Sequence, residues 1–163
     1  MVGSLVENAL TEFRQSYDIY IDSGTGLTAA ALLLGLGYLH LPWRVVVVSM
    51  TGQERCEFDR LLANLGEEFL RLTGESPKVP EWELTYPPVG RSFGSTGAAA
   101  IQEIKDTACR EGILRDPLYS AKLILAYRAE RDENRPSILL ISGGERELLG
   151  FQKPLRDWLC TTS

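Results

Sequence analysis

The sequence predicts an α/β domain, a three-layer arrangement in which helices cover both faces of a mostly parallel sheet. Apolar runs of strand length alternate with longer segments of helical periodicity along the chain. The run Arg44–Ser49 (RVVVVS) holds four consecutive valines, which implies a strand buried on both faces. Residues 17–49 contain a strand, a loop, a helix and a strand in succession, which is a βαβ unit whose crossover should be right-handed.

Each element of the first half has its own signal. Apolar residues at helical spacing predict a helix over 5–15, and aromatic and β-branched residues predict a strand over 17–21. Asp22–Gly26 is a turn cluster. An Ala- and Leu-rich helix then runs to about His40, and Leu41-Pro42 ends it before the valine strand.

The second half continues the alternation. The expected elements are a helix over 53–72 with Phe58, Leu61, Leu62, Leu65, Phe69 and Leu72 on one face, a strand over 82–86, a loop over 87–97, a helix over 98–110 closed by Glu111-Gly112, a helix from an Asp116 N-cap to about Arg131, a buried strand over 137–141, and a last helix bent or restarted by Pro154. No repeat or linker divides these elements, so we expect residues 1–163 to form a single domain.

The composition argues against several classes of protein. The chain has 163 residues, of which 44% are hydrophobic and 24% charged, so it is neither disordered nor fibrous. Its net charge of −5 argues against nucleic acid or an anionic membrane as the main partner. Cys56, Cys109 and Cys160 form no CxxC pair, which favours reduced thiols over a disulfide or zinc site. With only His40, His-based triads are disfavoured, and we expect this histidine and the cysteines to be buried packing residues.

One apolar segment raises the question of a membrane span. Residues 26–43 hold no Asp, Glu, Lys or Arg, but they include three glycines and lead directly into the valine strand. A buried helix followed by a buried strand is the better interpretation. Residues 1–15 lack the features of a secretory signal, so we expect a cytoplasmic protein with no membrane partner, and an organellar destination stays open.

A first candidate binding loop follows the first expected strand. In open α/β sheets, ligands bind beyond the carboxyl ends of the strands. The loop Ser23–Thr28 opens a helix there, and free backbone N–H groups at a helix start favour a phosphate. Gly24 and Gly26 permit close backbone approach, and Thr25 and Thr28 add hydroxyl groups. The alternative is a tight turn that merely connects strand and helix.

Known phosphate motifs fit this loop poorly. Gly24-x-Gly26-x-x-Ala29 matches the dinucleotide fingerprint formally, but the following strand ends in Ser49-Met50-Thr51 without the acidic residue that should hold a ribose. No Gly-Lys-Ser/Thr is present, so a Walker loop is excluded. A second loop, Asp116–Lys122, is by itself only a capped helix start. A third, Ser142–Gly144, is equally well a backbone cradle or a structural turn.

Taken together, the loops carry a family resemblance. The features are Asp22–Thr28 (DSGTGLT), Gly35–Trp43 (GLGYLHLPW), Phe93-Gly94, Glu111–Leu114 (EGIL), Asp116–Lys122 (DPLYSAK), and Ser142–Gly144 ahead of Phe151. In order and spacing over residues 17–151 they resemble the second half of the fold-type-II pyridoxal-phosphate enzymes of the 1-aminocyclopropane-1-carboxylate (ACC) deaminase and D-cysteine desulfhydrase family. The resemblance implies a fold like part of the tryptophan synthase beta subunit.

The resemblance also implies residue roles. The cofactor phosphate would lie on Ser23, Gly24, Thr25, Gly26, Leu27 and Thr28. Ser120 would be the partner of the pyridine nitrogen, Tyr119 an active-site phenol, and Ser142 and Gly143 neighbours of the ring. The deaminase has a carboxylate where this chain has Ser120, and a hydroxyl supports a weaker electron sink, which favours the desulfhydrase branch. The alternative interpretation of Ser120 is a surface residue in the first turn of a helix.

The family reaction acts on a small amino acid. It is an elimination or deamination that releases a 2-oxo acid and ammonia, with H₂S from D-cysteine. The family's reactive lysine, which bonds covalently to the cofactor, lies in the first half. The lysines of this chain are Lys78, Lys105, Lys122 and Lys153, and Lys122 matches a different family lysine. We therefore expect a truncated or half-length member that holds pyridoxal phosphate non-covalently at best and has little activity alone.

Four other features depart from the family pattern. Phe93 lies where some members carry Tyr, and Ala121 replaces a usual Gly. Ser142 replaces a frequent Thr, and the run Glu145–Glu147 is unusually charged. Two further hypotheses remain: a non-catalytic module that binds a phosphorylated small molecule or a partner protein, and a small α/β protein without a ligand. If an N-terminal half is the missing partner, an exposed sheet edge or apolar face should favour homodimers or poor solubility.

Overall fold

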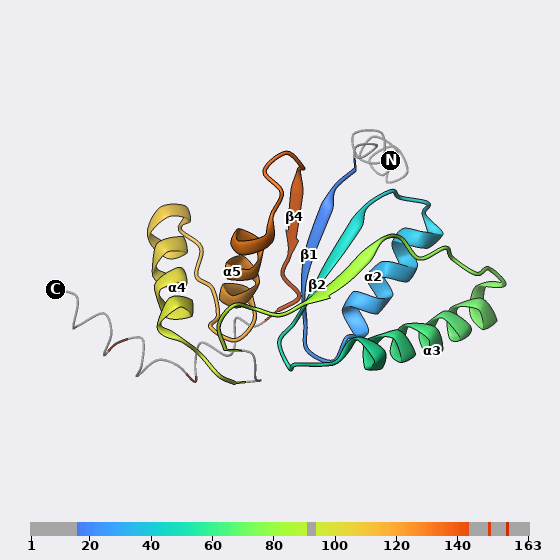
Figure 1. The fold of residues 1–163 in the computed structure, drawn as a ribbon, viewed down its shortest axis with the longest axis horizontal. Coiled ribbons are helices and arrows are strands. Elements are labelled where there is room, and N and C mark those ends of the chain that lie inside the picture. Colours follow the sequence, from blue (N-terminus) through green and yellow to red (C-terminus); the bar gives the residue numbers. More distant parts are fainter. Residues whose placement is uncertain (1–15, 91–93, 144–149, 151–155, 157–163) are drawn as a thin grey trace.

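The computed structural model describes residues 16–90, 94–143, 150 and 156. Within these residues, four parallel strands form one sheet in the order β3-β2-β1-β4 (Figure 1). The elements are β1 (Asp18–Ser23), α2 (Leu27–Tyr38), β2 (Arg44–Ser49), α3 (Arg55–Thr73), β3 (Trp82–Thr85), α4 (Ala98–Glu111), α5 (Ser120–Glu130) and β4 (Ser137–Leu140). The expected α/β fold class is confirmed. The helix expected over 5–15, Phe93, Glu145–Glu147, Pro154 and Lys153 lie outside the described residues.

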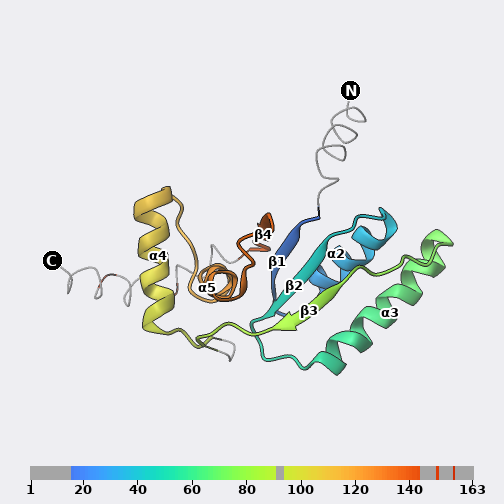
Figure 2. The same ribbon diagram turned by 45° about the horizontal axis from the view of Figure 1, so that its top comes forward.

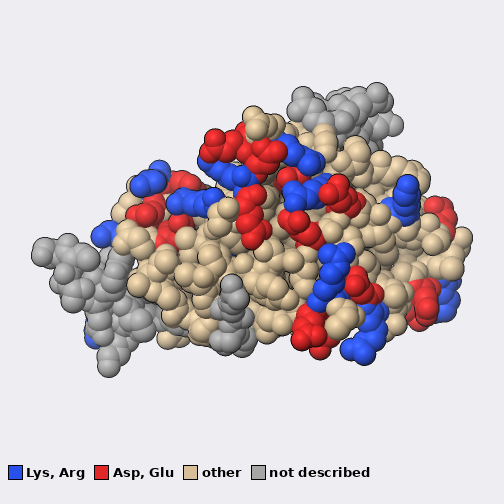
Figure 3. All heavy atoms as spheres, viewed as in Figure 1, with Lys and Arg blue, Asp and Glu red and all other residues tan. Residues whose placement is uncertain are grey.

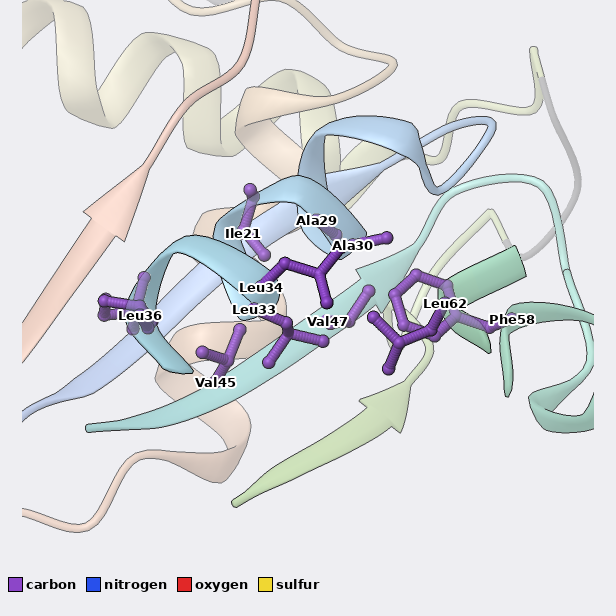
Figure 4. Close-up of a cluster of buried hydrophobic side chains, with 11 residues drawn as sticks. Ile21, Ala29, Ala30, Leu33, Leu34, Leu36, Val45, Val47, Phe58 and Leu62 are labelled. Carbon is purple, nitrogen blue, oxygen red and sulfur yellow. The ribbon is translucent and has the colours of Figure 1, made fainter. Parts of the chain in front are cut away.

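Helices cover both faces of the sheet (Figure 2). Ile19, Ile21, Val45 and Val47 point to one face, where α2 and α3 pack on them (Figure 4). Tyr20, Val46 and Val48 point to the other face, against α5, and α4 packs on the outer side of α5. All four valines of β2 are fully buried, as the unbroken valine run predicts.

Two expected helices differ in detail. Helix α5 begins at Ser120, four residues after the proposed N-cap Asp116, because the Asp116 carboxylate holds a separate turn over 116–120. Leu72, expected on the apolar face of α3, is 73% exposed. The buried residues of α3 are Phe58 and Leu62, in its first half, so the end of the helix extends past the core.

Two predictions of burial are wrong. Strand β4, expected to be buried, is half-buried and Leu140 is exposed, because β4 is an edge of the sheet that the described residues form. His40, Cys56 and Cys109 are exposed rather than packed inside. His40 lies beyond the end of α2 with φ of 53°, and the two cysteines lie on exposed positions of α3 and α4.

The apolar segment 26–43 is the buried helix α2 and the approach to β2, as predicted. Among the described residues, no helix combines the length and apolar character needed to cross a membrane. Figure 3 shows positive and negative side chains intermixed over the face it presents, with no extended area of one sign.

Candidate functional site

The three candidate loops meet at the carboxyl ends of the central strands. Strand β1 lies between β2 and β4, so the loop after Ser23 and the loop after β4 are neighbours. A Cβ atom on Gly24 would lie 3.6 Å from the ring and 3.6 Å from the hydroxyl of Tyr119, so the first and second loops touch. Ser142 hydrogen-bonds to Asp22 at the end of β1, which joins the third loop to the first.

The first loop leaves the start of α2 open. No side chain caps this helix, and its first turn holds no acidic residue. Thr25, Leu27 and Thr28 are exposed, whereas Ser23 is buried and its Oγ has no hydrogen-bond partner in the described part of the chain. Free N–H groups, nearby hydroxyls and an unsatisfied buried hydroxyl suit an anion such as the phosphate of pyridoxal phosphate.

The packing of the fold explains why residue 26 is a glycine, without reference to a ligand. Its φ is 89°, and a Cβ atom there would lie 2.8 Å from Leu61 Cδ2 and 3.1 Å from Phe58 Cδ2 on α3. Only glycine allows α2 and α3 to pack this closely in this backbone conformation. The tight-turn interpretation therefore accounts for Gly26, while no comparable clash restricts Gly24.

The second loop is organised by the carboxylate of Asp116. Its Oδ1 accepts the N–H groups of Leu118 and Tyr119, at 2.8 and 2.7 Å. Its Oδ2 accepts the N–H and the hydroxyl of Ser120, at 2.9 and 2.6 Å. Ser120 is 2% exposed, so it is not a surface residue of the first helical turn.

Asp22 is a site residue that the sequence analysis placed only within a turn. It is 1% exposed and accepts hydrogen bonds from the backbone N–H of Ser142, at 2.8 Å, and from the Ser142 hydroxyl. Burial raises the pKa of Asp22; the bonds from Ser142 lower it, and the nearby charge of Asp116 raises it further. The signal in the sequence was an acidic residue directly after the apolar run of the first strand, which ends in Tyr20 and Ile21.

Lys122 is the lysine nearest to the site residues in sequence, and it is fully buried. Its Nζ donates a hydrogen bond of 2.6 Å to the carbonyl oxygen of Gly90, in the segment between β3 and α4. Burial lowers the pKa of Lys122, and the charge of Asp116 raises it. Lys78, by contrast, is exposed. Within the described ranges no group of three metal-ligating side chains is found.

Comparison with known proteins identifies relatives of the chain. It is 30% identical over 116 residues to a rice protein (Oryza sativa subsp. japonica) provisionally named D-cysteine desulfhydrase 2, mitochondrial; the match covers 65% of the chain and 28% of the relative. It is 30% identical over 130 residues to a Pyrococcus abyssi protein provisionally named 1-aminocyclopropane-1-carboxylate deaminase, covering 78% of the chain and 39% of the relative. A Pyrococcus furiosus protein of the same provisional name matches equally well, at 30% identity over 131 residues.

Structural comparison identifies the same group of relatives. The crystal structure of a protein described as an ACC deaminase homologue superposes with a TM-score of 0.69 at 30% identity, covering 86% of this chain and 43% of that one. No protein-family model matches the sequence. The chain thus spans less than half the length of these relatives. In sequence and in fold, it is a relative of the ACC deaminase and D-cysteine desulfhydrase proteins over that part of their length.

Proposed function

We propose that this chain forms the phosphate- and ring-binding portion of a pyridoxal-phosphate-dependent enzyme acting on a small amino acid. The observation that carries the proposal is the uncapped start of α2. The loop that leads into it holds Gly24, which lies against Tyr119, and Ser23, whose buried hydroxyl has no hydrogen-bond partner among the described residues. The relationship to ACC deaminase and D-cysteine desulfhydrase proteins supports it independently. When bound, the cofactor supplies an electron sink for bond cleavage at the amino acid.

The residues divide the work of binding. The N–H groups at the start of α2, together with Thr25 and Thr28, hold the phosphate. Tyr119 borders the same loop, with its ring and hydroxyl close to Gly24. Asp22 fixes Ser142 just beyond the end of β4, where Ser142 and Gly143 would line the ring of the cofactor. Both D-cysteine and ACC are candidate substrates, since relatives of both names match the chain.

We expect the reactive amine to come from elsewhere; of the lysines of this chain, Lys153 lies outside the described residues. Lys122 is enclosed and bonded to Gly90, and Lys78 lines a different cavity at the opposite end of the sheet, beside Arg44. The 163-residue chain alone should therefore release little H₂S from D-cysteine. Full activity would need a lysine from another segment or a second polypeptide. The second candidate function is a non-catalytic module that binds a phosphorylated small molecule through the same loop.

The test is a titration of the purified chain with pyridoxal phosphate, monitored by absorbance. The sample is then reduced with borohydride, and mass spectrometry shows whether a lysine carries a covalent adduct. We expect saturable binding and no adduct on a single lysine. Thr25→Asp should weaken binding at least tenfold, because it places a carboxylate at the phosphate. Asn64→Asp, an equal charge change on an exposed position of α3, should leave binding unchanged. Absence of saturable binding would contradict the proposal, and a specific lysine adduct would show an autonomous enzyme.

A further inference from the structure

The hydroxyl of Ser120 has almost no hydrogen-bonding capacity left. A serine hydroxyl has one hydrogen to donate and two lone pairs to accept with. Ser120 donates its hydrogen to Asp116 Oδ2, at 2.6 Å, and accepts the backbone N–H of Asp116, at 2.8 Å. The carbonyl oxygen of Asp116, at 3.2 Å, competes for the same hydrogen. What remains is one lone pair, so Ser120 can meet a ligand only as an acceptor.

The side chain of Asp116 acts only as a hydrogen-bond acceptor in its turn. All four groups within hydrogen-bond distance of its two oxygens are donors: three backbone N–H groups and the Ser120 hydroxyl. The residue is 1% exposed, so water does not disperse its charge. A hydroxyl bonded to a buried carboxylate carries more negative charge on its oxygen than a free hydroxyl, because neighbouring hydrogen bonds polarise one another.

From this we infer that Asp116 and Ser120 act as one unit that accepts a hydrogen bond from a protonated ring nitrogen. The inference rests on the proposed function, because it concerns pyridoxal phosphate in this site. An unprotonated pyridine nitrogen is itself only an acceptor, and two acceptors cannot bond to each other. A pyridinium N–H, in contrast, matches the remaining lone pair of Ser120, and the charge of Asp116 lies one hydrogen bond behind it.

The chain would thus keep the function of the deaminase carboxylate although it has a serine at that position. A lone hydroxyl would leave the ring nitrogen neutral; the Asp116–Ser120 pair holds its proton. Among the described residues, the charged groups near the pair include Asp22 on β1, whose ionised form would support the pyridinium. Lys122 on α5 and Arg115, which directly precedes Asp116, carry positive charges that oppose it. Tyr119, one residue before Ser120, lies on the same turn.

The experiment is nitrogen NMR of the chain loaded with pyridoxal phosphate labelled with ¹⁵N in the ring. At pH 8 we expect the bound label to resonate in the pyridinium range. Ser120→Ala and Asp116→Asn should each move it to the neutral pyridine range. Asp132→Asn is the matched control, since Asp132 also accepts a backbone N–H two residues on, from Asn134, but lies on an exposed turn. It should keep the pyridinium signal.

The outcomes separate the two proposals. A neutral signal in the unaltered chain, or a pyridinium signal that survives Ser120→Ala, would overturn the role of the pair while leaving cofactor binding intact. If Asp116→Asn fails to fold, Ser120→Ala decides alone, because alanine is readily accepted at the start of a helix. No saturable binding by the unaltered chain would overturn the proposed function and this inference with it.

Discussion

At the residue scale, the phosphate loop combines a glycine that the fold requires with one that it does not. Gly26 has a left-handed backbone and lies against α3, so its side chain position is blocked. Gly24 has room for a methyl group at ordinary contact distance from Tyr119. Stability and ligand binding can therefore be tested separately within one loop.

Gly26→Ala should destabilise the chain by about 1–3 kcal/mol, because alanine is strained at this φ and its Cβ would meet Leu61. Gly24→Ala is the control and should change the unfolding free energy by less than about 0.5 kcal/mol. Urea unfolding followed by circular dichroism measures both. Equal losses in the two variants would refute the distinction.

Asp22 links stability to pH. Because burial raises its pKa in the folded state, the folded chain favours the protonated carboxyl group. This contribution to stability is complete below the ordinary pKa of 3.8 and is lost as pH rises through the raised folded value. Asp22→Asn should remove this loss of unfolding free energy, because asparagine does not ionise. The difference in unfolding free energy between the variant and the unaltered chain should therefore shift in favour of the variant as pH rises.

Ser142→Ala provides the companion test for Asp22. It removes a hydrogen bond that lowers the Asp22 pKa, so the decline should extend to higher pH. The measurement is the unfolding free energy from urea titrations across the acid-to-neutral range. Parallel pH profiles for Asp22→Asn and the unaltered chain would contradict this account.

Sequence alone could predict the motif residues of the site but not their connections. The loops containing Gly24, Tyr119 and Ser142 were identifiable from turn chemistry and from the family resemblance. The roles of Asp22 and Asp116 depend on hydrogen bonds formed after the strands align and the turn closes. No local pattern distinguishes such a carboxylate from one that faces solvent.

At the scale of elements, the central strands β1 and β2 were predictable because burial on both faces leaves a plain apolar pattern. The helix starts were less so, since Asp116 caps a turn instead of α5 itself. Helix α3 shows why periodicity overstates burial: its apolar stripe continues past the point where the sheet ends. Phe58 is fully buried and contacts Trp82, whereas Leu72 is mostly exposed.

Phe58→Ala should cost about 3–5 kcal/mol of stability, as expected when a large buried aromatic side chain is removed. Leu72→Ala, on the same helix and the same predicted stripe, should cost no more than about 0.5 kcal/mol. Thermal or urea unfolding distinguishes them. A large loss at Leu72 would mean that the end of α3 is covered in solution.

At the scale of the whole molecule, apolar side chains stay exposed around the site. Leu27 opens α2, Tyr86 follows the end of β3, and Ile113 and Leu114 lead into the Asp116 turn; all four are 37–58% exposed. Exposed apolar groups of this kind favour association.

The chain should self-associate with increasing concentration, and Leu114→Glu should shift it toward the monomer. Sedimentation velocity over a concentration series is the measurement. Lys105→Glu supplies a charge change on α4 as a control for general repulsion, and it should leave the distribution closer to that of the unaltered chain. A monomer at every concentration would rule out this expectation.

Ion pairs link the strands at the opposite end of the sheet, where the strands begin. Arg44 of β2 bonds to Asp18 of β1 at 3.0 Å and to Glu83 of β3 at 2.6 Å, and Arg135 pairs with the same Asp18 at 2.9 Å. Three strands are thus tied at their amino ends, while their carboxyl ends lead into loops. Local opening should therefore begin at the loops, and amide hydrogen exchange should be slowest over 44–47. Pyridoxal phosphate should slow amide exchange over 22–28 and 116–120 and leave exchange at the amino ends of the strands unchanged. Ligand binding would therefore rigidify only the loop end of the sheet.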